Sequence, residues 1–306
     1  MAQIPEQIDI MINNECNARC GFCVQEATYK ALSEDNATFL AGVQKHVSDY
    51  VSLGGKRIIV TGGEPTLRPE QLEQVLHFLA QVGDLEFVTM YTNGSQLLRT
   101  REGESIAQRL RDRGLSCVNH SVHHFDANKN RAVFRISGIP NPADVATHLR
   151  TIGLPFRYCA TIQKGGLENT KDLVGYLKFA EENGAKDVYF RELFQIDPES
   201  ASKMGPVEYT RQHFIPVDSL VSQLKSAGCI EAGQRSQFQG RQKNEIGMTT
   251  KTGFPFFVST LRIGKEQSEK LPYLVVMPDG HLYTTWCGTK FRIPSLKSQI
   301  YAGGLL

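Results

Sequence analysis

The stretch IDIMINNECNARCGFC, residues 8–23, joins a short apolar run directly to three closely spaced cysteines. Cys16, Cys20 and Cys23 are separated by three and then two residues. Thiolates at this spacing can surround one compact, soft metal centre, which is either a zinc ion or an iron–sulfur cluster. A structural zinc ion normally has four protein ligands, whereas the next cysteine along the chain is Cys117. The motif therefore predicts a metal centre with an open coordination position.

Runs typical of strands alternate with amphipathic, helical patterns over the first two thirds of the sequence. The strand candidates cover the ranges 8–12, 57–61, 86–92, 117–124, 156–162 and 186–193. The stretch PEQLEQVLHFLAQV, residues 69–82, is one of the helical patterns between them. This alternation predicts parallel strands joined by right-handed crossovers. We expect an α/β fold in which residues 1–195 form a partial (β/α)6 barrel, with reactive groups at the carboxyl ends of its strands.

The regular alternation ends near residue 196, so we interpret residues 196–306 as a C-terminal extension that serves as a substrate lid. A helical pattern is present near residues 206–227, and the polar, glycine-containing stretch 231–254 is typical of a long loop or lid. The run PYLVVMPDGHLYTTWCG, residues 272–288, contains two β-rich segments joined at an Asp-Gly pair. The extension is therefore expected to contain a β-hairpin.

The amino-acid composition argues against nucleic acid and membranes as binding partners. The 306 residues include 34 basic and 32 acidic side chains, so the chain carries no basic excess for binding nucleic acid or an anionic membrane. The N-terminal sequence lacks a secretion signal, and no run approaches the roughly 20 apolar residues of a membrane span. Seven cysteines in such a chain argue for thiolates used as ligands or reagents rather than for a disulfide framework. We expect a cytoplasmic protein with no nucleic-acid or membrane partner.

A second motif supports one reading of the cysteines. TGGEP, residues 61–65, comes directly after the second predicted strand. Together with the C-x3-C-x2-C pattern and the aromatic Phe22 before its last cysteine, this motif resembles the signature of the radical S-adenosylmethionine (radical SAM) superfamily. The resemblance extends over roughly residues 8–193. It implies one 4Fe–4S cluster as cofactor, together with S-adenosylmethionine (SAM).

The resemblance also implies a role for each motif residue. The cluster ligands would be Cys16, Cys20 and Cys23. The methionine part of SAM would chelate the open iron, Phe22 would lie by the adenine, and Gly62, Gly63 and Glu64 would receive the methionine ammonium. Two glycines let backbone carbonyls approach a small cation closely, and a glutamate can add a charge-assisted hydrogen bond. The further residues expected to contact the cofactor are Asn93, Ser121, Gln163 and Arg191.

Strand parity gives an independent prediction of which side chains enter the barrel. If Ser121 points inward, Asn119 and His123 do so too, whereas Val118 and Val122 face the helices. On the fifth strand the residues predicted to point inward are Arg157, Cys159, Thr161 and Gln163. Because a substrate cavity requires a polar interior, we select His123 and Arg157 as candidate substrate contacts.

The resemblance implies an enzyme that reduces SAM and cleaves it to methionine and a 5′-deoxyadenosyl radical. The radical would abstract hydrogen from a small-molecule or peptide substrate, and a reducing partner such as flavodoxin or ferredoxin would supply the electron. By analogy we expect a natural-product or modified-peptide pathway. Only Cys229 and Cys287 lie beyond the core, so a second cluster is not expected.

Cys287 has three interpretations: a buried structural thiol, a hydrogen-atom donor to the substrate radical, or a ligand to a second centre. Because the tail lacks further clustered cysteines, the donor role is favoured over the ligand role. Two alternative functions also remain open at this stage. The cluster could direct a different cleavage of SAM and transfer a 3-amino-3-carboxypropyl group. Alternatively, the chain could be a non-catalytic iron–sulfur or zinc sensor.

Overall fold

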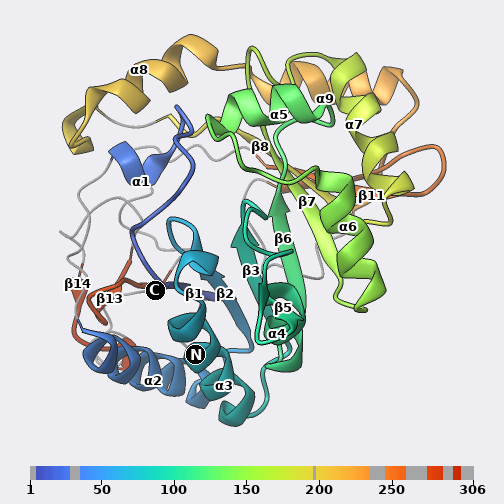
Figure 1. The fold of residues 1–306 in the computed structure, drawn as a ribbon. Coiled ribbons are helices and arrows are strands. Elements are labelled where there is room, and N and C mark those ends of the chain that lie inside the picture. The colour runs from blue at the N-terminus through green and yellow to red at the C-terminus, as the bar shows by residue number, and fades with distance from the viewer. Residues whose placement is uncertain are drawn as a thin grey trace.

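The structure is a computed structural model that describes residues 5–27, 35–195, 198–233, 245–259, 274–284 and 292–297. A parallel sheet forms its centre (Figure 1). The strands that correspond to the predicted ones are β1 (Ile8–Met11), β2 (Arg57–Thr61), β3 (Phe87–Thr92), β6 (Cys117–Ser121), β7 (Phe156–Ile162) and β8 (Val188–Glu192). They lie side by side in this order, and each pair of neighbours is parallel. The predicted α/β fold is confirmed.

Helices connect these strands and cover the outer face of the sheet (Figure 1). They are α2 (Asn36–Ser52), α3 (Pro69–Val82), α4 (Ile106–Asp112), α5 (Ala127–Phe134), α6 (Pro142–Thr151) and α7 (Thr170–Glu182). Helix α3 illustrates why the sequence folds in this way. It begins at a proline, buries Leu72, Val75, Leu76 and Leu79 along one face, and ends before Gly83. Two short strands, β4 (Thr100–Arg101) and β5 (Glu104–Ser105), form a separate ribbon before α4.

The two faces of the sheet differ in the way that strand parity predicts. On β7, the outward residues all belong to the main hydrophobic core: Phe156, Tyr158, Ala160 and Ile162. The inward Cys159 instead joins a small separate cluster with Tyr189 and Phe257. On β6, Val118 packs in the main core, whereas the side chain of Asn119 donates a hydrogen bond to Thr89 Oγ1 at 3.2 Å. The inner face of the sheet is therefore partly polar.

The C-terminal part of the chain adds a parallel strand at each side of the predicted sheet. Strand β11 (Pro255–Ser259) pairs with β8, and β12 (Leu274–Val276) pairs with β1. The further strands of this part are β9 (Ile230–Glu231), β10 (Glu245–Thr249), β13 (Leu282–Tyr283) and β14 (Arg292–Ile293). The predicted hairpin is confirmed as β12 and β13, and its turn includes Gly280 at φ 73°. Among the described residues, no helix is both long and apolar enough to cross a bilayer.

One prediction for this part of the chain is wrong, and another is confirmed with the helical segment divided in two. Residues 245–249, predicted within a loop, form β10, because they find an antiparallel partner in β11 that no local pattern announces. The helical pattern near residues 206–227 is two helices, α8 (Met204–His213) and α9 (Val217–Ser226). Pro216 separates them, since proline lacks the N–H group that would continue the first helix.

Candidate active site

The cysteine loop and the TGGEP turn lie against each other beyond the ends of β1 and β2. Backbone hydrogen bonds join Gly63 N–H to Asn13 O at 2.9 Å and Glu64 N–H to Glu15 O at 2.7 Å. A Cβ atom on Gly62 would lie 2.9 Å from Asn13 O, and one on Gly63 would lie 2.0 Å from Glu15 O. The two glycines therefore allow the cysteine loop to approach the turn, a reason for their presence that sequence reasoning missed.

Among the described cysteines, the three of this loop are the accessible ones. No described cysteine forms a disulfide; Cys16 is exposed and Cys20 and Cys23 are half-buried, whereas Cys117, Cys159 and Cys229 are buried. A backbone hydrogen bond from Cys23 N–H to Cys20 O, at 3.2 Å, closes a tight turn between two of the thiols.

Burial is the main cause that raises the pKa of Cys20, and the neighbouring Cys23 and Cys16 raise it further. A cationic metal centre would offset the mutual repulsion of three thiolates and favour their deprotonated form. Over the described ranges, no three His, Cys, Asp or Glu side chains gather closely enough to hold a single metal ion. In a 4Fe–4S cluster the thiolates bind different irons, so their sulfurs need not converge on one point. The donor set fits such a cluster.

Glu64 organises the loops around the cysteines. Its carboxylate is buried and accepts hydrogen bonds from Thr66 N–H at 3.2 Å, the Thr66 hydroxyl, the Thr92 hydroxyl at 2.7 Å and Asn93 N–H at 2.7 Å. Burial raises the pKa of Glu64, and these hydrogen bonds oppose the shift. Sequence reasoning assigned this carboxylate to the cofactor and did not anticipate its protein partners.

Asn93 extends this network to the cysteine loop. Its side-chain Nδ2 donates to Asn17 Oδ1 at 2.9 Å, and its Oδ1 accepts from Ser95 N–H at 2.9 Å. Asn17 in turn donates to Ser95 Oγ at 2.9 Å. Asn17 lies between the first two cysteines of the motif, so the loop after β3 fixes the position of the cysteine loop. Only the polar character of Asn17 and Ser95 in the sequence pointed to their role.

His123 lies beside the cysteine loop. Its ring contacts the Phe22 ring edge-on, with centroids 5.0 Å apart, and the Phe134 ring at 4.7 Å. Burial lowers the pKa of His123 to about 3, so the imidazole is neutral at pH 7. Its Nδ1 accepts a hydrogen bond from Thr161 N–H at 3.2 Å, which places the ring proton on Nε2. The structure thus brings Phe22 and His123 together, and it supplies a fixed N–H donor.

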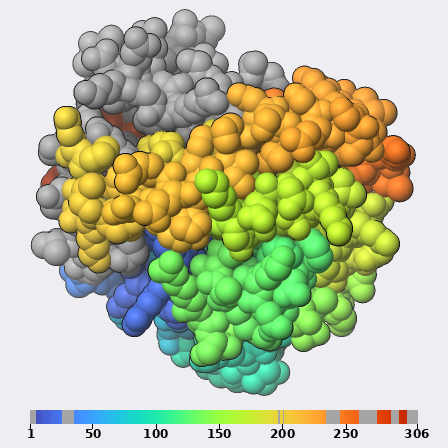
Figure 2. Space-filling view, turned by 90° about the horizontal axis from the view of Figure 1, so that it is seen from above, coloured from blue at the N-terminus to red at the C-terminus, as the bar shows by residue number. Residues whose placement is uncertain are grey.

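Helix α8 lies over the cysteine loop (Figures 1 and 2). The short helix α1 (Val24–Ala27), which follows the last cysteine, packs against α8. The ring of Tyr209 lies against Gly21, where a Cβ atom would be 2.4 Å from ring carbon Cδ2. The Tyr209 hydroxyl donates to Gln163 Oε1 at 2.9 Å, and its ring stacks on His213 at 3.9 Å. Sequence reasoning missed Tyr209, because a single aromatic residue in an amphipathic helix carries no specific signal.

The other predicted cofactor residues lie at the carboxyl ends of their strands. Ser121 is the last residue of β6, and the buried Gln163 directly follows β7. The Arg191 guanidinium in β8 lies over the rings of Tyr91, at 4.7 Å, and Tyr189, at 5.2 Å, and it donates to the Tyr91 hydroxyl.

Arg157 lies deeper in the sheet than Gln163, and its guanidinium shares the Tyr189 ring with Arg191, at 5.0 and 5.2 Å from the ring centroid. It is the second residue of β7, six residues before Gln163, which corresponds to about 20 Å along the strand. Its guanidinium is fully buried and pairs with Asp187 at 2.5 Å, between the rings of Tyr189 and Phe257. The structure does not bring Arg157 to the cysteine loop, and its substrate role stays a prediction. Cys287 lies outside the described residues.

The fold and this site define a class of protein, namely α/β enzymes that carry a thiolate-bound cluster in the loop after the first barrel strand. A family model described as the Radical SAM superfamily matches residues 10–180, which is more than half of the chain. The chain belongs to the radical SAM superfamily. It is an enzyme with a 4Fe–4S cluster and SAM as cofactors. Radical SAM enzymes act on substrates and need a reductant.

The chain is also similar to curated proteins named GTP 3′,8-cyclase. The protein of Listeria monocytogenes serotype 4b is 23% identical over 227 residues, which are 74% of this chain and 63% of that protein. The protein of Marinobacter nauticus is 28% identical over 189 residues, or 61% of this chain and 53% of that protein. The chain thus spans less than two thirds of the length of these relatives.

Two solved structures share the fold. SuiB of Streptococcus suis bound to its precursor peptide SuiA aligns with a TM-score of 0.60 and 12% identity, over 92% of this chain and 59% of that one. The structure of anSMEcpe with bound SAM aligns with a TM-score of 0.56 and 12% identity, over 94% of this chain and 76% of that one. At this identity the likeness concerns the fold alone.

Proposed function

We propose that this enzyme reductively cleaves SAM and uses the resulting 5′-deoxyadenosyl radical to abstract hydrogen from a small-molecule or peptide substrate. The main support for this proposal is the pair of backbone hydrogen bonds that holds the cysteine loop against the TGGEP turn. When bound, the cluster would supply one electron for the cleavage of SAM, and hydrogen abstraction from a substrate C–H bond would leave 5′-deoxyadenosine.

The residues of the site divide into three tasks in this proposal. The cluster ligands are Cys16, Cys20 and Cys23. The cofactor contacts are Phe22, Gly62, Gly63, Glu64, Asn93, Ser121, Gln163 and Arg191. We assign the methionine ammonium to the backbone of the turn, since the carboxylate of Glu64 already accepts hydrogen bonds from protein donors. His123, whose neutral ring offers an N–H group beside Phe22, is the substrate contact that the geometry supports best.

The proposed iron–sulfur chemistry also suggests the cellular compartment, the reductant and the pathway. An iron–sulfur enzyme with accessible thiols requires a reducing compartment, so we place the protein in the cytoplasm, with flavodoxin or ferredoxin as its reductant. A natural-product or modified-peptide pathway is the proposed context. GTP, which the names of the relatives specify, is the first small molecule to test as substrate. The extension 196–306 continues the sheet through β11 and β12, and its action as a substrate lid, with Cys287 as a hydrogen-atom donor, is part of the proposal.

The test is anaerobic cluster reconstitution, reduction with excess dithionite in the presence of SAM, and analysis of the nucleoside product. 5′-Deoxyadenosine is the expected product, and the Cys20→Ala variant, lacking a cluster ligand, should yield none. Methylthioadenosine would instead indicate 3-amino-3-carboxypropyl transfer. A zinc-loaded protein that leaves SAM intact would indicate a sensor. Cys287→Ala should still cleave SAM and should lose the substrate product only.

A further inference from the structure

Two exposed arginines lie at the cysteine loop, one within it and one beside it. Arg19 lies within the motif, directly before Cys20, and Arg135 follows the last residue of α5. A backbone hydrogen bond from Arg19 N–H to Phe134 O, at 2.9 Å, fastens the loop to the end of α5. This bond holds the two arginine backbones next to each other. Arg19 and Arg135 therefore lie next to each other beside Cys20.

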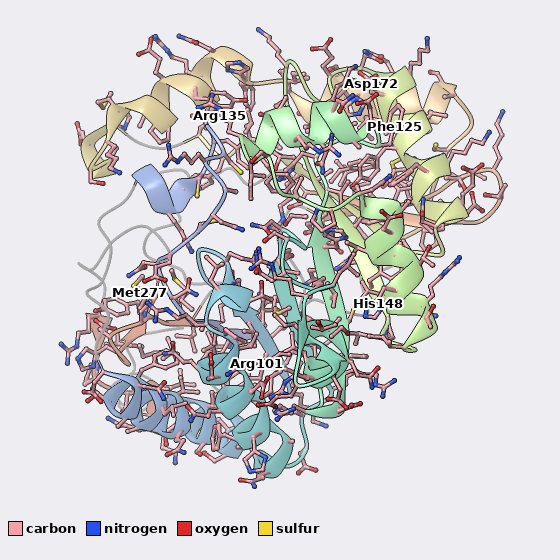
Figure 3. All side chains as sticks on the ribbon, viewed as in Figure 1. Arg101, Phe125, Arg135, His148, Asp172 and Met277 are labelled. Atoms are coloured by element: carbon pink, nitrogen blue, oxygen red, sulfur yellow. The ribbon has the colours of Figure 1, made fainter. Side chains whose placement is uncertain are left out.

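Arg135 is held in place rather than extended freely into solvent. Its backbone is left-handed, with φ 53° and ψ 43°, and its N–H donates to Arg131 O at 2.8 Å. Its guanidinium lies 5.5 Å above the ring of Tyr209, whose ring packs against Gly21 of the motif. Figure 3 shows Arg135 between α5 and α8, beside the loop after β1. The guanidinium is thus fixed close to the cluster loop.

Within the described residues, neither arginine is neutralised by a carboxylate. Several other exposed arginines pair with carboxylates: Arg68 with Glu15, Arg101 with Glu70 and Arg211 with Glu208. Across the described part of the chain, neither Arg19 nor Arg135 forms such an ion pair. Arg131, one helical turn before Arg135, donates to the neutral Asn128 side chain at 2.9 Å. The three residues form a positive surface, the Arg19–Arg131–Arg135 patch.

We propose that the Arg19–Arg131–Arg135 patch is the docking surface for an acidic one-electron carrier protein that reduces the cluster. This inference rests on the proposed function only in requiring a cluster that a protein must reduce. Three thiolate ligands make the site negative, so an acidic carrier would be repelled unless nearby cations offset that charge. The patch supplies those cations on the loop that bears the thiols, which steers the carrier to the shortest electron path.

The experiment measures cluster reduction by a flavodoxin hydroquinone in stopped flow, at several salt concentrations. The Arg19→Glu, Arg135→Glu double variant should lower the second-order rate constant at low salt by about tenfold or more. It should also remove the decrease of that rate with added salt. Arg99→Glu is the matched control, because Arg99 is also exposed and lies two residues from Arg101, which Figure 3 shows far from Arg135. Arg19→Lys, Arg135→Lys should keep most of the rate.

Three further measurements separate docking from other effects. Iron content, the cluster reduction potential and the final yield of 5′-deoxyadenosine with excess dithionite should match the unsubstituted enzyme. An unchanged flavodoxin rate, or a loss that an altered reduction potential accounts for, would overturn the docking surface. A patch variant with no iron would be replaced by Arg131→Glu alone, which leaves the motif intact. The proposed function fails separately, if the unsubstituted enzyme forms no 5′-deoxyadenosine with dithionite.

Discussion

Replacing Glu64 by glutamine should destabilise the protein before any cofactor binds. The carboxylate accepts hydrogen bonds from Thr66 N–H, the Thr66 and Thr92 hydroxyls, and Asn93 N–H. Glutamine has the same shape but one acceptor oxygen fewer, and its NH2 group must face some of these donors. Threonine hydroxyls can rotate to become acceptors, whereas the two backbone N–H groups cannot. At least one backbone N–H therefore loses its partner in either orientation of the amide.

The size of the effect follows from this arrangement. A buried donor left without a partner costs about 1–3 kcal/mol. The remaining bonds also lose the contribution of the negative charge, which makes a hydrogen bond roughly twice as strong as a neutral one. Removing a buried charge acts in the opposite direction, since burial raises the pKa of Glu64. We expect the free energy of unfolding of Glu64→Gln to fall by about 1–3 kcal/mol.

The assay is urea unfolding of the iron-free protein, paired with calorimetric titration of SAM into the reconstituted protein. Glu86→Gln serves as the control, because Glu86 is exposed and its ion pair with Arg57 at 3.3 Å is worth at most about 1 kcal/mol. A Glu64→Gln variant of unchanged stability with weakened SAM binding would refute the reasoning. That result would show that the carboxylate serves the cofactor and not the loops.

Three further outcomes are expected. Cys16→Ala, and equally the alanine variants of the other two motif cysteines, should lose the brown colour and the roughly four irons per chain, measured by absorbance and iron analysis. Gly21→Ala should lower the free energy of unfolding by about 1–3 kcal/mol, because its Cβ would lie 2.4 Å from the ring of Tyr209, and adding Tyr209→Ala should cost less than the sum of the two changes. Burial lowers the pKa values of His46 and His120 to about 4, so stability should be complete above the unfolded pKa of about 6.5 and fall as the pH drops toward 4. His46→Gln should flatten that pH dependence in urea titrations, and an unaltered slope would contradict it.

Local patterns in the sequence predicted the inner six strands and the hairpin well. Each of those elements is announced by an apolar-rich run, by alternating apolar and polar residues, or by an Asp-Gly turn, and the two motifs followed strands that proved to be neighbours. Strand parity also predicted the division between apolar outer and polar inner residues on β7. These features depend on residues close together in the chain.

Features that depend on distant partners could not be predicted in the same way. Residues 245–249 have no strong alternation, and their pairing with β11 makes them a strand. Tyr209 meets Gly21 only because the chain returns to the cysteine loop after more than 180 residues. The assignment of Glu64 to the cofactor came from motif resemblance, which does not reveal that Thr92 and Asn93 approach the same carboxylate.

The pairing of β12 with β1 and of β11 with β8 has a practical consequence for anyone who shortens this chain. A protein that ended at residue 195 would retain the matched segment 10–180 but would leave one edge of β1 and one edge of β8 without a partner strand. Both strands are almost entirely buried in the whole chain. Long apolar strands with bare edges pair with other copies and aggregate. Residues 255–259 and 274–276 thus cover the two edges of the six-stranded parallel core, and we expect the family-matched segment without them to self-associate.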